Sequence, residues 1–220
     1  MELTLFDLDG TLLPIDSDHA FGEYLVAIGW ADAAEFRRRN DTFYHQYLLG
    51  ELDVAGYVEF ATAPWRDRPD AVAMRERFVA EIIDPALRPP ALDLVRAHQA
   101  AGDLVAIVTA TNEFVTAPIA QAFGVQHLLA LKLARDAAGR LTGGIEGVPT
   151  YREGKVTRVD EWLGGLDLRR SAFERVIVYS DSTNDLALLE QATDPVATNP
   201  SAALEAIALE RGWRVLKLFA

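Results

Sequence analysis

Residues 3–11 of the 220-residue chain read LTLFDLDGT, and no other stretch indicates the fold class as clearly. Its first four residues are apolar or β-branched, which is typical of a buried strand. The strand is expected to end at Asp7, and because side chains alternate along a strand, those of Asp7 and Asp9 project to the same side. Gly10 allows a sharp turn directly afterwards. The stretch therefore predicts a buried strand that delivers two carboxylates to one edge of a sheet.

Four later apolar runs have the same character and are also expected to be strands. These runs are residues 104–108, 176–179, 195–197 and 214–216. Helical patterns occupy the intervals beside them, at residues 88–101, 153–163, 184–191 and 201–211. Because nearly continuous apolar strands alternate with helices, we expect an α/β fold, namely a Rossmann-like parallel sheet with helices on both faces.

The interval between the first strand and the helix at 88–101 does not fit this alternation. A crossover between parallel strands needs only about a dozen residues, yet this interval shows helical periodicity in four blocks. The blocks are residues 18–29, 32–49, 52–62 and 69–84. We therefore expect an inserted all-helical subdomain at residues 14–86, with an α/β core formed by residues 1–13 and 87–220.

The larger apolar side chains of the insert are expected to form its own core and not a ligand site. These side chains are Phe21, Tyr24, Leu25, Phe36, Phe43, Tyr44, Tyr47, Tyr57 and Phe60. A second, smaller departure from the alternation covers residues 128–149. Two short apolar runs, 128–133 and 141–145, flank a turn there and predict a small β-hairpin.

The composition limits the classes of protein to which the chain can belong. Acidic residues outnumber basic residues by 33 to 21, which gives a formal net charge of −12. Nucleic acids and anionic membranes both demand a basic footprint, so we expect neither as a partner. The chain has no cysteine, which excludes disulfides and thiolate chemistry. It shows neither a basic, apolar leader nor an apolar run of about 20 residues, so we expect a cytoplasmic protein.

Asp181 and Asp185 follow the predicted strand at 176–179. Because the carboxyl ends of parallel strands form the edge where ligands bind, these acids are expected to meet Asp7 and Asp9 there. Four buried carboxylates are costly unless a cation compensates their charge. An all-oxygen donor set suits a hard ion, so the sequence predicts a Mg²⁺ site. For any single acid the alternative is a turn or helix-cap role, which Asp also favours.

Lys155 is one of only three lysines and stands at the start of a predicted helix. A cation there opposes the helix dipole, so an anion between it and the carboxylates would account for its position. Thr109 follows the strand at 104–108 and precedes a helix, where its hydroxyl and the free backbone amides can cradle a phosphate. Taken singly, Lys155 could be a surface lysine and Thr109 a β-branched filler of the strand.

This set of motifs resembles the haloacid dehalogenase (HAD) superfamily of phosphotransferases. The motifs occur in that family's order: residues 7–11 (DLDGT), Thr109, Lys155 and residues 181–185 (DSTND). The helical insert is similar to a type C1 cap, and the cap together with the hairpin is typical of subfamily IB. That branch contains phosphoserine phosphatase-like and histidinol-phosphate phosphatase-like members. The resemblance implies the HAD fold and a Mg²⁺-dependent phosphatase that acts on a small phosphorylated metabolite.

The resemblance also implies roles for individual residues. Asp7 would be the nucleophile that forms an aspartyl-phosphate, and Asp9 would be the general acid and later the general base. Mg²⁺ would be held by Asp7, Asp181 and the backbone carbonyl of Asp9. Thr109 and Lys155 would bind phosphoryl oxygens. The phosphate-binding and supporting positions would be Gly10, Thr11, Ala110, Asn184 and Asp185.

The insert is expected to determine the substrate. It carries 14 acidic and 7 basic residues, which favours an amine or imidazolium beside the phosphate and disfavours polyanions such as nucleotides. Asp16 corresponds to the acidic position that meets the substrate amine in phosphoserine phosphatases, and Asp18 is a neighbouring candidate. Arg66 and Arg68 could meet a substrate carboxylate or remain solvated. Residues 109–112 read TATN, where phosphoserine phosphatases usually have Ser followed by glycines, and this weakens phosphoserine as the substrate.

The motifs leave three functions open. The first is hydrolysis of a small phosphate monoester, with histidinol phosphate and phosphoserine as candidates. The second is phosphoryl transfer to an acceptor other than water, as in a mutase, through the same aspartyl-phosphate. The third, a phosphate-sensing module without catalysis, is disfavoured because Asp7 and Asp9 are both present.

Overall fold

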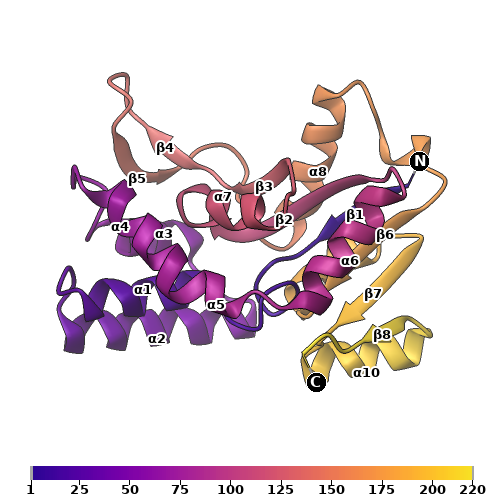
Figure 1. Ribbon diagram of the computed structural model, residues 1–220, viewed down its shortest axis with the longest axis horizontal. Helices are drawn as coiled ribbons and strands as arrows, with labels where there is room; N and C mark the ends of the chain where they lie inside the picture. Colours follow the sequence, from indigo (N-terminus) through magenta and orange to yellow (C-terminus); the bar gives the residue numbers. More distant parts are fainter. Residues whose placement is uncertain (1, 220) are drawn as a thin grey trace.

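The computed structural model describes residues 2–219, and its centre is a six-stranded parallel sheet (Figure 1). The strands lie in the order β3-β2-β1-β6-β7-β8, so β1 occupies a central position between β2 and β6. They are β1 (Leu3–Phe6), β2 (Leu104–Asn112), β3 (His127–Leu131), β6 (Val176–Ser180), β7 (Asp194–Thr198) and β8 (Arg214–Leu216). Every residue of β1 and β6 is buried, as a sheet covered on both faces requires. The expected α/β fold is confirmed.

Helices cover both faces of this sheet. On one face, α6 and α7 pack over side chains such as Phe6 and Ile107. On the other face, α8, α9 and α10 pack over side chains such as Leu5 and Val178. These helices are α6 (Pro89–Ala100), α7 (Glu113–Ala122), α8 (Glu153–Gly165), α9 (Leu186–Leu189) and α10 (Ala202–Arg211). With both faces covered, the carboxyl ends of the strands remain as the place for a ligand.

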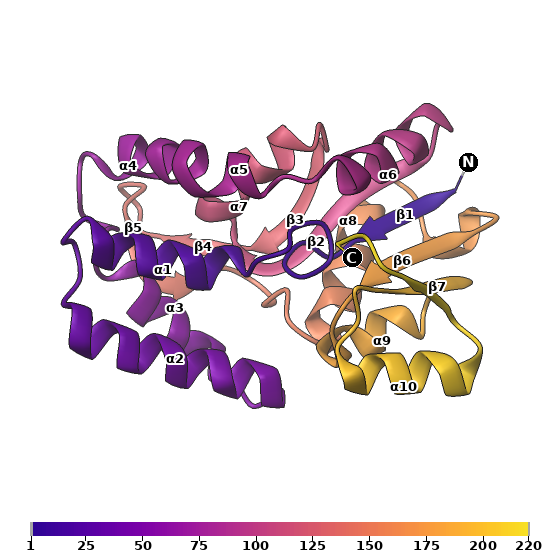
Figure 2. The same cartoon turned by 60° about the horizontal axis from the view of Figure 1, so that its bottom comes forward.

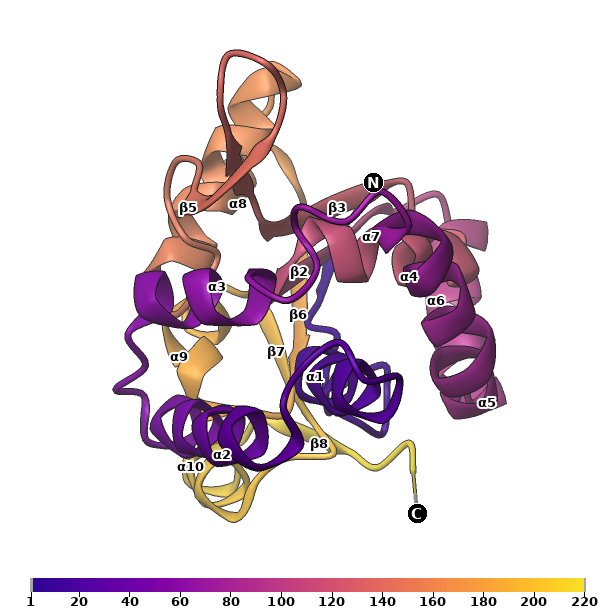
Figure 3. The same cartoon turned by 90° about the vertical axis from the view of Figure 1, so that its left-hand side faces the viewer.

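Residues 17–86 form a helical segment between β1 and α6. Its helices are α1 (Ser17–Ala27), α2 (Ala33–Leu49), α3 (Val54–Thr62), α4 (Ala71–Phe78) and α5 (Asp84–Ala86), and a π-helical turn at Val79–Ile83 joins the last two. Figures 2 and 3 show α1–α4 grouped beyond one end of the sheet, with α1 beside α2. No helix within residues 2–219 is long and apolar enough to cross a membrane.

Local sequence signals delimit α2. The side chain of Asp32 accepts a hydrogen bond from the Glu35 N–H at 2.9 Å and so caps the first turn. Gly50 follows the last turn with φ +73°, a left-handed conformation that costs glycine little. The helix therefore ends at a defined point, and this end lies near the active-site edge of the core.

The buried apolar side chains of the helical segment fall into two groups. Those of α1 and α4, such as Phe21 and Phe78, belong to the same cluster as Phe6 of the sheet. The second group is a small separate cluster that consists of Val26, Phe36 and Phe60. Helices α1 and α4 are thus continuous with the hydrophobic core, and α3 joins it through Val58, whereas the buried apolar side chain of α2, Phe36, packs only in the small cluster.

The predicted hairpin is confirmed, but the residues predicted for its first strand, 128–133, are mostly wrong. Residues 127–131 form β3, which pairs in parallel with β2 at the edge of the main sheet. The hairpin consists only of β4 (Leu133–Arg135) and β5 (Leu141–Ile145). The run that precedes the turn is continuously apolar, and such a run fits a buried sheet better than an exposed hairpin arm. The main sheet accordingly has six strands and not the five expected.

The helix expected at 184–191 is shorter and less regular than its sequence pattern suggests. The chain first forms a 3₁₀ turn at Thr183–Asp185, and α9 then extends only to Leu189. Ser182 Oγ accepts a hydrogen bond from the Asn184 N–H at 3.2 Å, and the Asp185 side chain points to Lys155. These polar contacts favour a tight turn over a regular helix start.

Candidate active site

The ends of three adjacent strands bring the predicted site residues to one edge of the sheet. Asp7 follows β1, and its backbone N–H donates to the carbonyl of Tyr179 in β6 at 2.9 Å. Thr109 lies in the last part of β2, and Asp181 directly follows β6. Because β1 pairs with both β2 and β6, segments that are far apart in the sequence meet at this edge.

Lys155, from the first turn of α8, bridges two buried carboxylates. Its Nζ donates hydrogen bonds of 2.7 Å to Asp7 Oδ1 and 2.7 Å to Asp185 Oδ2, and only 1% of the residue is exposed. Burial lowers the pKa of the Lys155 ammonium group, but the carboxylates of Asp185 and Asp7 outweigh burial and raise it overall. Ser180 Oγ donates to Asp185 at 2.8 Å, and burial raises the pKa of Asp185 to about 6. The cation is thus fixed beside Asp7.

The carboxyl group of Asp9 has different surroundings from that of Asp7. Its Oδ1 accepts a hydrogen bond from the Ser17 N–H at 2.8 Å, and its Oδ2 accepts one from Thr111 Oγ1 at 2.9 Å. Burial, followed by the charge of Asp16, raises the pKa of Asp9 well above its usual range. A carboxyl group whose pKa is raised beside a lysine-paired carboxylate is suited to general acid catalysis.

Thr11 and Asp181 complete the oxygen atoms around Asp7. Thr11 Oγ1 lies 3.1 Å from Asp7 Oδ2 and 3.2 Å from Asp181 Oδ1. Burial, together with the charges of Asp7 and Asp185, raises the pKa of Asp181 to about 9. Gly10 has φ +74°, and a Cβ atom at this position would overlap the Asp181 carboxylate. The turn therefore needs glycine, and the accumulated negative charge would be compensated by a divalent cation.

The donor atoms at this edge fit Mg²⁺ better than a softer metal. Within residues 2–219 no three acidic, histidine or cysteine side chains converge as a complete metal cage. The available donors are the carboxylates of Asp7 and Asp181, together with the backbone carbonyl predicted at Asp9. Such a set leaves the remaining positions to water, as Mg²⁺ prefers, and lacks the nitrogen or sulfur ligands typical of zinc.

The end of β2 supplies hydroxyl groups to the pocket, including one residue that the sequence analysis did not single out. The backbone N–H of Thr111 donates to Thr109 Oγ1 at 3.1 Å, which leaves the Thr109 hydroxyl proton available to a ligand. Ala110 lies between them in the wall of the pocket. Thr111 is the missed residue, because its hydroxyl holds Asp9. Its position two residues after Thr109 in a strand was the available signal.

Asn199 is a second supporting residue that the sequence analysis missed. Its Nδ2 donates to the backbone carbonyls of Gly10 at 3.0 Å and Thr11 at 3.1 Å, so it holds the loop that follows Asp7. Asn199 has φ +45°, a conformation that Asn tolerates better than most residues. Asn199 and Pro200 directly precede the helix expected at 201–211, as residues at a helix start do, and nothing in the local sequence points to a loop so far away.

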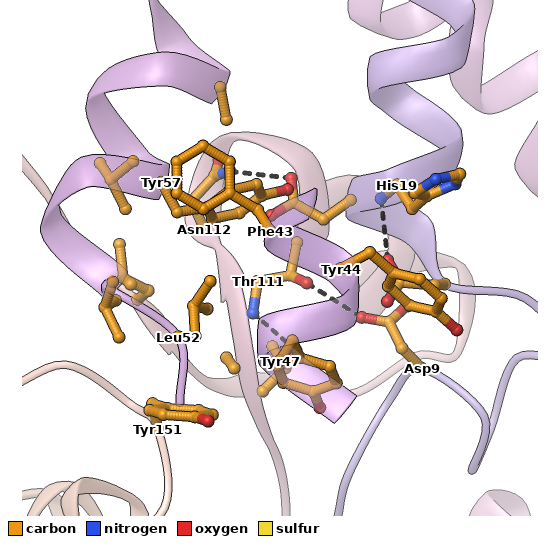
Figure 4. A pocket seen from close by; sticks show the side chains of 18 of the residues that line it. Asp9, His19, Phe43, Tyr44, Tyr47, Leu52, Tyr57, Thr111, Asn112 and Tyr151 are labelled. Atoms are coloured by element: carbon orange, nitrogen blue, oxygen red, sulfur yellow. Dashed lines mark hydrogen bonds between the residues drawn. The ribbon is translucent and has the colours of Figure 1, made fainter. Parts of the chain in front are cut away.

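A pocket extends from the carboxylates toward the helical segment (Figure 4). Aromatic rings form much of its wall, namely Phe43, Tyr44, Tyr47, Tyr57 and Tyr151. The expectation that the aromatic residues of the insert serve only its core is wrong for the first four of these. Helix α2 is apolar on two sides: Phe36 packs in the small cluster, while Tyr44 and Tyr47 line the pocket. Sequence periodicity cannot separate these two uses of an apolar side chain.

Asp16 and Asp18, from the start of α1, both line this pocket. Asp16 Oδ1 also accepts a hydrogen bond from the His19 N–H at 2.8 Å, so it caps the helix. Asp18 Oδ1 lies 3.5 Å from Asn112 Nδ2. Burial, followed by the charge of Asp16, raises the pKa of Asp18 to about 7, and hydrogen bonding with Tyr57 opposes this rise. The pocket therefore contains two acidic groups in addition to Asp7 and Asp9.

Arg66 and Arg68 are not among the residues that line the pocket. The guanidinium carbon of Arg68 lies 4.3 Å from the centroid of the Trp30 ring, and Arg66 packs against Gly143 of β5. Within residues 2–219, no lysine or arginine side chain lines the pocket. The pocket thus offers acids, aromatic rings and His19, but no permanent cation for a substrate carboxylate.

Asn184 contacts α2, whereas the resemblance placed it beside the phosphate. Its Nδ2 donates a hydrogen bond of 2.8 Å to the backbone carbonyl of Tyr47, and 7% of the residue is exposed. The side chain thus connects the loop after β6 with the end of α2.

Comparison with known proteins agrees with this geometry. The family model of haloacid dehalogenase-like hydrolases matches residues 4–190, a span that includes Asp7, Thr109, Lys155 and Asp185. The chain belongs to this family. It falls in the phosphoserine phosphatase-like subfamily and is a HAD-type phosphatase.

One curated relative and two solved structures are similar to the chain over nearly its whole length. A histidinol-phosphatase from Neisseria meningitidis serogroup C is 40% identical over 216 residues, which cover 97% of each chain. A crystal structure of a protein of unknown function from Bordetella pertussis Tohama I has a TM-score of 0.93 at 51% identity and covers 99% of both chains. A structure of a phospho-aspartyl intermediate analogue of phosphoserine phosphatase has a TM-score of 0.67 at 17% identity, covering 98% of this chain and 92% of that one. The last likeness concerns the fold alone.

Proposed function

We propose that this HAD-type phosphatase hydrolyses a small phosphate monoester that carries a protonatable nitrogen and no carboxylate, with histidinol phosphate as its substrate. The lining of the pocket carries the proposal, because Asp16 and Asp18 supply carboxyl groups that a cationic nitrogen would stabilise in their ionised form, while Tyr44 and Tyr57 supply aromatic surface. Carboxylates and aromatic faces both attract a cationic nitrogen. The name of the 40% identical relative, histidinol-phosphatase, supports the same substrate.

Phosphoserine suits the pocket less well than histidinol phosphate. Its carboxylate would be buried among Asp16, Asp18 and aromatic rings, and no lysine or arginine of the described residues lines the pocket to pair with it. Burying an unpaired charge is costly. Histidinol phosphate has an amine and an imidazole ring but no carboxylate, so Asp16 and Asp18 could each meet a nitrogen atom.

The contacts of Asp7 and Asp9 support hydrolysis in two steps. Asp7 attacks phosphorus, the bond from phosphorus to the substrate oxygen breaks, and Asp9 gives its proton to the leaving alkoxide. Water then attacks the aspartyl-phosphate, Asp9 takes a proton from that water, and the bond from phosphorus to Asp7 breaks to release inorganic phosphate. Lys155 spends two of its three N–H donors on Asp7 and Asp185, which leaves one for a phosphoryl oxygen beside the Thr109 hydroxyl.

Mg²⁺ is the cation that we assign to this reaction. Asp7, Asp181 and the Asp9 backbone carbonyl would hold it, with water at the remaining positions. When bound, it would neutralise the charge that the phosphoryl oxygens bring to the acidic edge. The raised pKa of Asp181, which follows from burial and from the neighbouring carboxylates, supports a need for such a cation.

The division of the chain into a core of residues 1–13 and 87–220 and a cap of residues 14–86 stays a prediction. Figure 4 supports a covering role for part of the insert, because Tyr44 lies beside Asp9 while Tyr57 lies beside Asn112 in the same pocket wall. A cover of this kind would exclude bulk water and add specificity groups.

Phosphate release from histidinol phosphate by the purified chain tests this function. We expect turnover in the presence of Mg²⁺ that EDTA abolishes and added Mg²⁺ restores, with one phosphate released per histidinol formed. Asp7→Asn should lower kcat by more than about a thousandfold, because the nucleophile is lost. Unchanged turnover by Asp7→Asn, or phosphate yields far below those of the alcohol, would reject hydrolysis through Asp7.

A matched pair of substrates tests the role assigned to the acidic pocket. Phosphoethanolamine and phosphoserine share an amine and a phosphate and differ by one carboxylate. We expect kcat/KM to be higher for phosphoethanolamine by at least about tenfold, because only phosphoserine would bury an unpaired anion. A preference for phosphoserine would contradict the proposed substrate class while leaving the chemistry at Asp7 intact.

A further inference from the structure

The C-terminal end of α2 is held by two side chains from the α/β core. Asn184 Nδ2 donates to the Tyr47 carbonyl at 2.8 Å, and Arg152 Nη1 donates to the Gly50 carbonyl at 2.7 Å. Carbonyls in the last turn of a helix lack partners four residues ahead, although the Tyr47 carbonyl also accepts a hydrogen bond from the Gly50 N–H at 3.0 Å. Here each receives a donor from a loop that borders the site, since Arg152 lies three residues before Lys155 and Asn184 lies beside Asp185.

The backbone has a positive φ angle at both residues of the Arg152–Gly50 contact. Arg152 has φ +51°, which is unfavourable for a residue with a side chain, and Gly50 has φ +73°. A Cβ atom on Gly50 would lie 3.2 Å from Arg152 Nη1 and 3.2 Å from Asn184 Oδ1. Unfavourable backbone conformations persist where the surrounding structure holds them, and they concentrate at functional contacts. The contact therefore requires close approach of these three residues.

Helix α2 has little other attachment to the α/β core. Its buried Phe36 belongs to the small cluster shared with α1 and α3, whereas α1 and α4 join the main hydrophobic cluster. Besides the two hydrogen bonds, the Tyr47 ring packs on Tyr151 of the core, with ring centroids 5.9 Å apart. Besides its packing on α1 and α3, α2 thus contacts the α/β core directly through this small set of contacts around residues 47–50.

Tyr47 lies in the part of α2 that this contact holds. It lines the pocket together with Asp7. Burial, followed by the charges of Asp7 and Asp185, raises the pKa of its hydroxyl well above the usual value. A protonated phenol in the same pocket as Asp7 can donate a hydrogen bond to an anion bound there.

We propose that Asn184 and Arg152 are positioning residues which hold the end of α2 on the core, so that the Tyr47 hydroxyl donates a hydrogen bond to the phosphoryl group at Asp7. The inference rests on the proposed attack by Asp7 on phosphorus, but it does not depend on which alcohol the substrate contains. It adds a donor from the insert to those of Lys155 and Thr109. Hydrogen-bond donors that contact the phosphoryl group in the transition state of its transfer act mainly on kcat.

The variant Tyr47→Phe tests the donor, because it keeps the ring against Tyr151 and the carbonyl that Asn184 holds. With p-nitrophenyl phosphate we expect kcat to fall about tenfold to a hundredfold with little change in KM. The inhibition constant of orthovanadate, which resembles the phosphoryl group in transfer, should rise by a similar factor. An unchanged kcat and an unchanged orthovanadate inhibition constant would overturn the role of Tyr47.

The variant Arg152→Gly tests the positioning role without adding backbone strain, since glycine adopts φ +51° at no steric cost. We expect kcat/KM to fall about fivefold or more while the melting temperature stays near that of the parent protein. Arg96→Ala is the matched control, because Arg96 lies on α6 with 67% of its side chain exposed. Parental kcat/KM in Arg152→Gly, or an equal loss in Arg96→Ala, would overturn the inference.

Combining the two substitutions distinguishes positioning from a general structural effect. If Arg152 acts through Tyr47, the loss caused by Arg152→Gly should shrink to less than half its size in the Tyr47→Phe background. Losses that simply multiply would contradict a shared role. If the parent protein shows no turnover that depends on Asp7, the proposed function is wrong. If turnover depends on Asp7 but is unchanged by Tyr47→Phe and Arg152→Gly, only the role of Tyr47 and Arg152 is wrong.

Discussion

Lys155 Nζ donates a hydrogen bond of 2.7 Å to Asp7 Oδ1, and both side chains are buried. The two residues come from the start of α8 and the end of β1, and Asp185 holds the same ammonium group from its other side. This contact keeps a positive charge next to the atom that would attack phosphorus. It allows an acidic chain to bind an anionic substrate, because the charge balance is set locally and not by the net charge of −12.

Replacement of this cation should damage both catalysis and folding. Lys155→Met would leave Asp7 and Asp185 buried without a counter-ion, and we expect kcat/KM to fall at least about a hundredfold. The free energy of unfolding should drop by about 3 kcal/mol, since breaking a buried ion pair is costly. Lys132→Met is the control, because the Lys132 side chain is 51% exposed. Similar kinetics and denaturant midpoints for the two variants would argue against the role of Lys155.

Removal of the proton donor should depend on the leaving group. Asp9→Asn cannot protonate an alkoxide, so hydrolysis of an alkyl phosphate should fall about a hundredfold or more. The loss should be smaller for p-nitrophenyl phosphate, whose leaving group needs little protonation. Asp67→Asn, which changes a side chain that is 80% exposed, controls for the loss of one charge. Equal losses on both substrates would assign Asp9 a role other than general acid.

Binding of Mg²⁺ should displace a proton. Since the pKa of Asp181 is raised to about 9 by burial and by the charges of Asp7 and Asp185, this group holds a proton at neutral pH in the metal-free protein. The apparent affinity for Mg²⁺ should therefore increase with pH, by up to about tenfold per pH unit below pH 9. Calorimetric titration at pH 6, 7 and 8 measures this, and Asp181→Asn should abolish the effect. A dissociation constant that does not vary with pH contradicts the prediction.

Asp18 should make the metal-free protein less stable as pH rises. Burial and the charge of Asp16 raise its folded pKa to about 7, so between about pH 4 and pH 7 the folded state binds a proton that the unfolded state has released. The free energy of unfolding therefore decreases with increasing pH across this window. Asp18→Asn should flatten the decrease and be the more stable protein at pH 8, by about 1–3 kcal/mol. Chemical denaturation at pH 5 and pH 8 checks this, and parallel curves for the two proteins would count against it.

The central part of the site could be predicted from the sequence because its residues follow strands. The run before Asp7 identifies a buried strand, and the ends of parallel strands must meet at one edge, so Thr109 and Asp181 follow from the same argument. Lys155 was detectable because a cation opposes the helix dipole at the start of α8. The parallel sheet itself could be predicted from the apolar runs of its strands, apart from β3.

The remaining features depend on contacts between distant segments, which leave no local pattern. Asn199 reaches the loop after Asp7 across almost the whole chain, and its sequence context indicates only a helix start. Arg152 holds a helix end in the insert, yet its neighbours suggest an ordinary surface residue. Tyr44 and Tyr47 occupy helical positions whose apolar character fits a core as well as a pocket. Only the three-dimensional arrangement separates these alternatives.

The ratio of kcat/KM for histidinol phosphate to that for phosphoserine, measured with Mg²⁺ at neutral pH, tests the central claim most directly. The acidic and aromatic pocket predicts a ratio of at least about 100, because a buried carboxylate without a cationic partner costs several kcal/mol. Asp18→Asn should reduce this ratio, and Asp67→Asn should leave it unchanged. A ratio of one or less would contradict the assignment of this phosphatase to a substrate that carries nitrogen and no carboxylate.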